Sequence, residues 1–162
     1  MEQLKKSIIA LLEENARYSD YQLAAMVGAN EDEVKTAIKE LEEDGIIVKY
    51  AAIINTEAIK EKKVQALIEV KVAPQKLKGF DQYAEDLYNF SEVTSLYLMS
   101  GGFDLAVFVE GVGLADIASF VSEKLSVIDG ITSVQTHFIL KKYKIEGQVT
   151  KPAEEKRQII QA

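Results

Sequence analysis

The sequence contains no cysteine and only one histidine, His137. Without cysteine the chain forms no disulfide, holds no iron–sulfur cluster and offers no thiolate to zinc. A single histidine excludes a histidine-rich metal site and makes a Ser-His-Asp triad improbable. We therefore expect no metal and no cofactor, and we predict that the protein is not an enzyme.

Proline and long hydrophobic runs are also scarce. There are two prolines in 162 residues, and no run of about 18 uncharged apolar residues exists. The N-terminus lacks the basic-then-apolar layout of a secretory signal. With 48% hydrophobic and 28% charged residues the chain is expected to fold. These features predict a cytoplasmic protein with no membrane partner.

Basic residues are fewer than acidic ones. The chain has 19 lysines and arginines against 26 aspartates and glutamates, a net charge of −7. Affinity for DNA comes mostly from the neutralisation of phosphates. The charge balance therefore argues against a nucleic-acid partner, and any such partner has to be supported by other features.

The first 54 residues have the pattern of three short helices. Ser19 or Asp20 can cap the second helix, which Gly28 ends, and Asn30 with Glu33 forms a variant capping box at the third. Residues 46–48 and 52–54 are rich in residues that favour strands. The apolar stripes are Leu4, Ile8, Leu11 and Leu12; Leu23, Ala24, Met26 and Val27; and Val34, Ala37, Ile38 and Leu41. Residues 1–54 are therefore predicted to be a winged helix-turn-helix, which is typical of DNA binding.

Residues 55–63 are predicted to be a linker, and a different pattern occupies residues 64–145. It predicts strands at 64–72, 93–99, 103–109 and 131–140, with helices at 77–87 and 114–125. This βαββαβ order is that of a ferredoxin-like unit, an antiparallel sheet with both helices on one face. The predicted fold class is therefore α+β, with a polar tail over residues 146–162.

The two middle strands of this module are apolar on both faces. Tyr97 and Met99 alternate with the core positions of one strand, and Ala106 and Phe108 with those of the next. A sheet face exposed to water would be polar. A second copy of the same sheet is the economical cover, so we predict a homodimer.

Several stretches, in this order and spacing, resemble the Lrp/AsnC (leucine-responsive, or feast/famine) family of transcription regulators. They are Tyr21 to Gly28, Leu41 to Ile47 with Lys49 and Tyr50, Ser100 to Asp104, and Asp129 to Ile131. The resemblance implies a domain that binds double-stranded DNA, joined to a module that dimerises, often assembles into octamers, and binds a small effector, typically an amino acid. It predicts a sequence-specific regulator of amino-acid or related metabolism.

Three residues of the third helix are the candidate DNA contacts. With Val34, Ala37 and Leu41 inward, the outward positions include Lys35, Thr36 and Lys39. Lysines reach phosphates or guanine edges, and threonine reaches a phosphate or a thymine methyl. Further candidates for phosphate contact are Arg17, Tyr21 and Gln22. The alternative interpretation is that all six are ordinary solvated surface residues.

The third helix departs from the family pattern. The family commonly ends this helix with Arg-x-Lys/Arg-Arg-Leu, whereas positions 37–41 here read Ala-Ile-Lys-Glu-Leu. Residues 31–44 contain seven acidic residues and two lysines, a net charge of −5. A helix with this net charge is repelled by the phosphates of DNA.

The predicted effector site is the turn Ser100, Gly101, Gly102, Phe103 and Asp104. Its exposed amides, hydroxyl and carboxylate suit the two charged ends of a zwitterion. The resemblance places it at an effector pocket near a subunit interface, and assigns Thr136 on the last strand to the same site. The alternative is a tight Gly-Gly turn with positive φ, Phe103 in the core and Asp104 as a cap.

Two other functions stay open at this stage. Haem-biosynthesis decarboxylases are similar to this family in both domains, but a tetra-anionic tetrapyrrole calls for several cations, and the first 156 residues contain one arginine. The other alternative is a metabolite-sensing module that acts through protein contacts and does not bind DNA.

Overall fold

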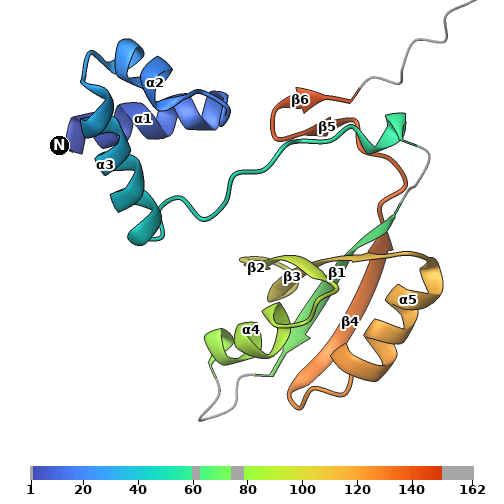
Figure 1. The fold of residues 1–162 in the computed structure, drawn as a ribbon. Helices are drawn as coiled ribbons and strands as arrows, with labels where there is room; N and C mark the ends of the chain where they lie inside the picture. The colour runs from blue at the N-terminus through green and yellow to red at the C-terminus, as the bar shows by residue number, and fades with distance from the viewer. Residues whose placement is uncertain (1, 60–62, 74–78, 151–162) are drawn as a thin grey trace, which may run out of the picture. The chain divides into compact units, whose positions relative to one another are not determined.

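The fold is taken from a computed structural model that describes residues 2–59, 63–73 and 79–150 (Figure 1). Contacts divide the chain into two compact units, Met1–Ile54 and Asn55–Ala162. Each unit has a hydrophobic core of its own. The units are described separately below.

The N-terminal unit consists of three helices: α1 (Glu2–Glu14), α2 (Asp20–Val27) and α3 (Glu31–Glu43). Their apolar stripes meet in one core formed by Ile8, Leu23, Ala24, Val34, Ala37 and Leu41. These are positions that the helical periodicity selects. Met26 is the exception, because its side chain is 52% exposed.

The two strands predicted for the wing are absent, so that prediction was wrong. Residues 46–54 contain no strand, and Ile46, Val48, Ile53 and Ile54 are exposed. A strand requires a hydrogen-bonding partner, and among the described residues the backbone N–H groups of Ile46 and Ile47 both donate to the carbonyl of Leu41 at the end of α3, not to another strand. Strand propensity alone is therefore not enough to form a wing here.

The C-terminal unit has the predicted ferredoxin-like order. It contains β1 (Val64–Val72), α4 (Phe80–Tyr88), β2 (Val93–Leu98), β3 (Leu105–Gly111), α5 (Leu114–Ser119) and β4 (Ile131–Phe138). The strands form one antiparallel sheet in the order β2-β3-β1-β4. Figure 1 shows α4 and α5 on the same side of this sheet.

The core of the C-terminal unit lies between the sheet and the helices. Ala66, Ile68 and Val70 alternate along β1 and are fully buried, and Leu105, Val107 and Val109 do the same along β3. Tyr83, Leu87, Ile117, Phe120 and Leu125 cover them from the helices. The period of two in the strands therefore identified the buried face correctly.

Some boundaries differ from the predicted ones. β3 begins at Leu105 rather than at residue 103, and β4 ends at Phe138 rather than at 140. After Ser119 the second helix continues as the π-helical turn η2 (Phe120–Leu125). A short 3₁₀ turn, η1 (Thr56–Ala58), lies in the predicted linker.

A small hairpin follows the sheet. It consists of β5 (Lys144–Ile145) and β6 (Gln148–Val149), and Thr150 after it is buried. Residues 146–150 of the predicted polar tail belong to this structure, which the sequence reasoning did not foresee. Residues 151–162, and Pro74 and Leu77 of the predicted second module, lie outside the described residues.

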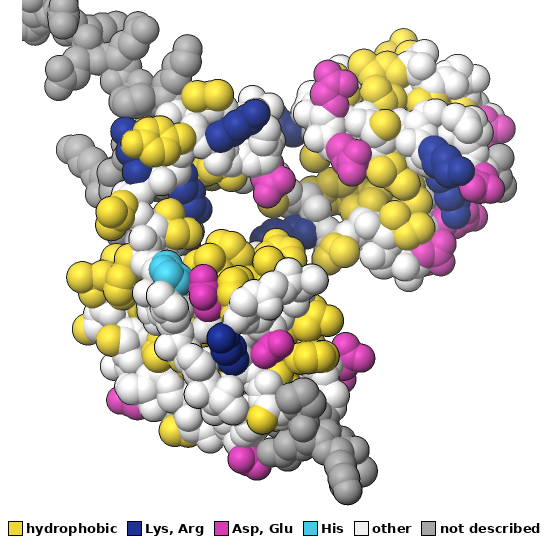
Figure 2. Space-filling view, turned by 180° about the vertical axis from the view of Figure 1, so that it is seen from behind, with side chains coloured by type: hydrophobic (Ala, Val, Ile, Leu, Met, Phe, Trp, Pro, Cys, Tyr) yellow, Lys and Arg dark blue, Asp and Glu magenta, His cyan; other side chains and the backbone are white. Residues whose placement is uncertain are grey.

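The sheet face opposite the helices is open. It carries Tyr97 on β2, Phe108 on β3, Leu67 and Glu69 on β1, and His137 on β4, as the strand register requires. Figure 2 shows this face, where hydrophobic side chains gather near a histidine and an acidic residue. The face is therefore mixed in character, with an apolar centre and a polar contact in which His137 Nε2 lies 3.3 Å from Glu69 Oε1.

Candidate nucleic-acid interface and effector site

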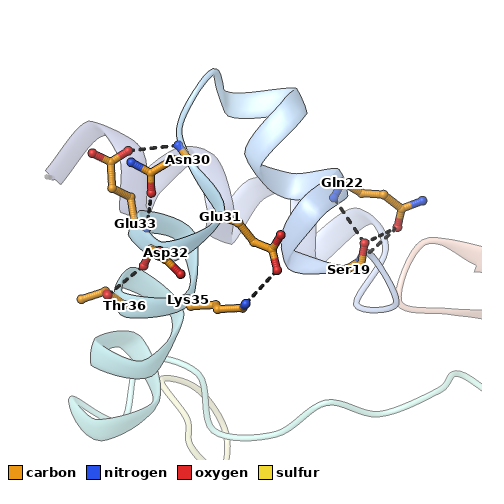
Figure 3. A network of polar contacts seen from close by, with 8 residues as sticks. All are labelled: Ser19, Gln22, Asn30, Glu31, Asp32, Glu33, Lys35 and Thr36. Carbon is orange, nitrogen blue, oxygen red and sulfur yellow. Dashed lines mark hydrogen bonds and ion pairs between the residues drawn. The ribbon is translucent and has the colours of Figure 1, made fainter.

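The turn between α2 and α3 is fixed by local hydrogen bonds. Gly28 ends α2 in the left-handed conformation, with φ of 69°. A capping box begins each helix, with Ser19 and Gln22 at α2 and Asn30 and Glu33 at α3 (Figure 3). The backbone N–H of Glu33 donates to Asn30 Oδ1 at 2.8 Å, and that of Asn30 donates to Glu33 Oε2 at 3.1 Å. The starting residue of each helix is therefore fixed by its own capping hydrogen bonds.

The outer face of α3 carries the three residues singled out from the sequence. Lys35, Thr36 and Lys39 are exposed, and the buried positions Val34, Ala37 and Leu41 lie on the inner side. The structure thus brings these three side chains to one solvent-facing surface, as the helical periodicity predicts.

Each of these side chains already has a partner on the same helix. Lys35 Nζ lies 2.7 Å from Glu31 Oε1, and Lys39 Nζ lies 3.5 Å from Glu43 Oε1. The hydroxyl of Thr36 donates to the Asp32 carbonyl at 2.8 Å (Figure 3). The hydrogen bond to Glu31 raises the pKa of Lys35. Each carboxylate therefore competes with phosphate for its lysine. The Glu31–Lys35 spacing belongs to the alternative interpretation, in which these residues form an ordinary solvated helix face.

The three candidates at α2 are not equivalent. Tyr21 is 72% exposed, and Arg17 precedes α2 in an exposed turn and makes no ion pair with any described residue. The Gln22 side chain instead accepts the Ser19 backbone N–H at 2.9 Å. The Ser-x-x-Gln spacing of a capping box would have identified this role from the sequence.

The charge of the N-terminal unit is unusual for a DNA-binding domain. Residues 1–54 contain eleven acidic and six basic residues, a net charge of −5. Two further lysines are paired, Lys5 with Glu40 at 2.8 Å and Lys6 with Glu2 at 2.7 Å. Among the described cations of this unit, Arg17 and Lys49 are the two without an ion pair. Few positive charges are thus available to phosphate.

One tyrosine ties α3 to the segment that follows it. The Tyr50 hydroxyl donates to Glu42 at 2.9 Å. Burial, followed by this hydrogen bond, raises the pKa of Tyr50 to about 12. This contact fixes the path of the chain just after the helix-turn-helix.

The turn between β2 and β3 differs from the tight Gly-Gly turn considered as an alternative. Its residues 100–103 are closed by a bond from the Met99 N–H to the Asp104 carbonyl at 2.8 Å. Neither Gly101 nor Gly102 has positive φ, and a Cβ at either position would meet no atom within 4 Å. Nothing in the described chain requires glycine at these two positions.

The carboxylate of Asp104 is engaged within the chain. Its Oδ2 accepts the Val72 backbone N–H at 2.9 Å, and the Asp104 N–H donates to the Val70 carbonyl at 3.0 Å. Asp104 thus joins the turn to the end of β1. Ser100, Gly101 and Gly102 are exposed, and Phe103 and Asp104 are half-buried.

The structure does not bring Thr136 to the turn. Thr136 pairs with Ile68, whereas Asp104 bonds Val70 and Val72 at the end of β1. Because β1 and β3 separate β4 from β2, the distance across the sheet is about 10 Å or more. Within one chain, Thr136 and the turn do not form one site.

No helix in the described part of the chain is long and apolar enough to span a membrane. Residues 2–59, 63–73 and 79–150 also contain no group of histidine, aspartate or glutamate residues placed to hold a metal ion. The sequence reasoning missed Glu43, which pairs with the candidate Lys39 at the end of α3.

The fold and these sites define a class of protein: a helix-turn-helix unit joined to a ferredoxin-like module. Family models for the winged helix-turn-helix DNA-binding domain and for the Lrp/AsnC ligand binding domain match residues 1–48 and 65–149. The chain therefore belongs to the Lrp/AsnC family, and it is a DNA-binding transcription regulator with a ligand-binding domain rather than an enzyme.

Relatives of known name agree with this assignment. The Bacillus subtilis HTH-type transcriptional regulator YugG is 44% identical over 154 residues, covering 94% of this chain and 93% of that protein. The Pyrococcus horikoshii regulator LrpA is 34% identical over 139 residues, covering 86% and 96%. A crystal structure of a Neisseria meningitidis transcriptional regulator in complex with L-methionine has a TM-score of 0.69, with 25% identity and coverage of 92% and 96%.

Proposed function

We propose that the regulator contacts its operator through the outer face of α3. Lys35, Thr36 and Lys39 meet the major groove, and Arg17 and Tyr21 meet flanking phosphates, with Gln22 as a further candidate through its free amide group. The observation that carries this assignment is the firmly capped α2–turn–α3, which leaves this one face of α3 exposed. In helix-turn-helix proteins the second helix of the motif enters the major groove.

We further propose that two copies pair to read a pseudo-palindromic site in the cytoplasm. The support is the open sheet face, which carries the exposed Tyr97 and the half-buried Phe108, together with the exposed Met99 at the end of β2. Two-fold pairing would place two α3 helices in successive major grooves, about 34 Å apart. Assembly of such dimers into an octamer is consistent with this arrangement.

We propose an amino acid as the effector, with the turn from Ser100 to Asp104 as a contact. The Neisseria regulator forms a complex with L-methionine, and this ligand of a relative supports the same ligand class here. The two exposed glycines support the turn, because neither φ nor crowding within the chain requires them. Glycine is also used where another molecule approaches the backbone closely. Thr136 would join the site only through another copy.

Fluorescence anisotropy of duplex DNA from upstream of the protein's own gene tests these assignments. The affinity should fall with salt, with a slope of about −0.9 for each phosphate contacted. An amino acid that is the effector should change the affinity at fixed salt. The DNA-contact assignment is wrong if substitution of Lys35, Thr36 and Lys39 leaves the affinity unchanged.

A further inference from the structure

One histidine and one glutamate lie together on the open face of the sheet. His137 Nε2 on β4 is 3.3 Å from Glu69 Oε1 on β1, and the two side chains are 43% and 30% exposed. Figure 2 shows the histidine beside an acidic side chain, near hydrophobic side chains of the same face. Histidine ordinarily changes its charge between pH 5 and 8, and His137 is the only histidine of the chain. The charge of this face therefore changes with pH at this contact.

Glu69 lies in the interior of the sheet face. β1 is a central strand of the sheet, and its register places Glu69 between Ala106 of β3 and Gln135 of β4. Neither of these neighbours carries a charge. The carboxylate of Glu69 therefore lies within the area that a second copy of the sheet would cover, and an uncompensated carboxylate is costly to remove from water.

The other charged and titratable groups of this face do not pair with Glu69 in the part of the chain that the structure describes. Lys71 follows Glu69 by two residues on β1, but it is exposed and lies beside Ser133 near the end of the strand. The remaining groups are Tyr97 on β2, two strands away from Glu69, Glu110 on β3, which accepts Lys63 Nζ at 2.6 Å, and Lys142 and Glu146, which line a cavity with Gln65. Tyrosines, lysines and carboxylates ordinarily keep their charge between pH 6 and 8.

Removal of water strengthens the contact between His137 and Glu69. In a single copy both side chains are partly exposed, and an exposed ion pair contributes little free energy. Under a second sheet the two charges would interact at a lower effective dielectric constant and attract each other more strongly. With a neutral imidazole, the covered face would instead hold the carboxylate without a compensating charge. Paired sheets therefore favour the protonated imidazole more than separate sheets do.

We propose that the pairing of two copies through this face is coupled to protonation of His137. The dimer binds more protons than two separate chains, so its association constant rises as the pH falls from about 8 to about 6. A tighter dimer also binds a DNA site with two half-sites more tightly. The inference rests on the proposed function, because it takes the open sheet face as the pairing surface and adds regulation of that surface by pH.

Fluorescence-detected analytical ultracentrifugation of the labelled full chain tests the coupling. Dilution series at about pH 6 and about pH 8, at constant ionic strength and without DNA, give the dissociation constant of the dimer. This constant should be about tenfold lower at the acidic pH, because each of the two imidazoles in a dimer contributes about threefold. An equal dissociation constant at both pH values, or a higher one at the acidic pH, would overturn the inference.

Two variants assign the pH dependence to the pair. His137→Asn should have the same dissociation constant at both pH values, because asparagine does not gain a charge. Glu69→Gln keeps the imidazole but removes the carboxylate, so that protonation places an unpaired cation between the sheets. The dimer of Glu69→Gln should therefore weaken about threefold as the pH falls, opposite in sign to the wild type. A purely structural role of Glu69 would not reverse the sign.

The matched control is Glu85→Gln. It removes the same charge from an exposed position of α4, which lies on the other side of the sheet (Figure 1). This variant should keep the tenfold pH dependence of the wild type. If His137→Asn keeps the pH dependence, or Glu85→Gln loses it, the inference is overturned.

Tyr97→Glu separates this inference from the proposed pairing. If this variant is monomeric and the wild-type dissociation constant does not vary with pH, the pairing face is supported and the inference is overturned. If this variant dimerises as tightly as the wild type, the pairing face is wrong and the inference is overturned with it. The anisotropy measurement then still decides whether the protein binds DNA through α3.

Discussion

The paired lysines of α3 lead to a prediction about DNA affinity. Substitution of Glu31 and Glu43 by glutamine removes the carboxylates that hold Lys35 at 2.7 Å and Lys39 at 3.5 Å. Exposed pairs at i and i+4 are weak, so each release should strengthen DNA binding about two- to threefold. The double variant should bind about fivefold more tightly at low salt, with additional gain from reduced repulsion of phosphate.

The assay is anisotropy on the upstream duplex and on a random duplex, from about 50 to 200 mM salt. If the lysines stay paired in the wild-type complex, the double variant gains two phosphate contacts and its slope steepens by about 1.8. If they already reach phosphate, the affinity rises and the slope does not change. In both cases the gain in DNA affinity over the wild type should become smaller at higher salt, because salt screens the charges.

The matched control is Glu14→Gln at the end of α1. Glu14 is exposed and makes no ion pair with a described residue, and its substitution changes the net charge by the same amount as either single substitution on α3. If Glu31→Gln and Glu43→Gln bind DNA no better than Glu14→Gln, the reasoning is refuted. The change in DNA affinity would then come from the net charge alone, or α3 would not be the surface that contacts DNA.

Three further predictions concern stability. Gly28→Ala should cost about 1 kcal/mol in urea unfolding because φ is 69°, whereas Gly101→Ala, at an open position without positive φ, should leave the midpoint unchanged. Ile68→Ala, at a fully buried position of β1, should cost about 2–5 kcal/mol by the same measurement. The hydrogen bonds from Lys63 and Gln65 lower the pKa of Glu110. The stability that ionised Glu110 contributes is therefore complete above its unfolded-state pKa and is lost as the pH falls through the lower folded-state pKa. In Glu110→Gln the urea midpoint should fall less steeply with decreasing pH below about 4.5, and an unchanged pH dependence would contradict this.

Helix ends and strand bounds could be predicted from the sequence where they depend on residues close together in the chain. The capping residues Ser19 and Asn30 and the terminating Gly28 fixed the helix ends, and alternation along β1 gave its exact bounds. These features depend on residues a few positions apart, so they can be read without knowledge of the tertiary structure.

Features that depend on partners distant in the chain could not be predicted in this way. Residues 46–54 have the composition of strands but lack a partner strand, and the last residue of the turn, Asp104, is bonded to the end of β1, more than 30 residues away in the sequence. Lys142 and Glu146 line a cavity with Gln65 of β1 only because the chain folds back after β4. The predicted link between Thr136 and the turn failed for the same reason, since strand order separates them.

The charge of the N-terminal unit also bears on why this regulator would need more than one copy. With a net charge of −5 and two unpaired cations among its described residues, one helix-turn-helix unit contributes little phosphate neutralisation. Two units linked through their C-terminal modules bind the second half-site intramolecularly, which raises the overall affinity by about 10²–10⁴. Tyr97→Glu on the open sheet face should therefore weaken DNA binding by a similar factor while leaving α3 untouched. Analytical ultracentrifugation should show monomers of this variant, and a monomer that binds the full site as tightly as the wild type would contradict the argument.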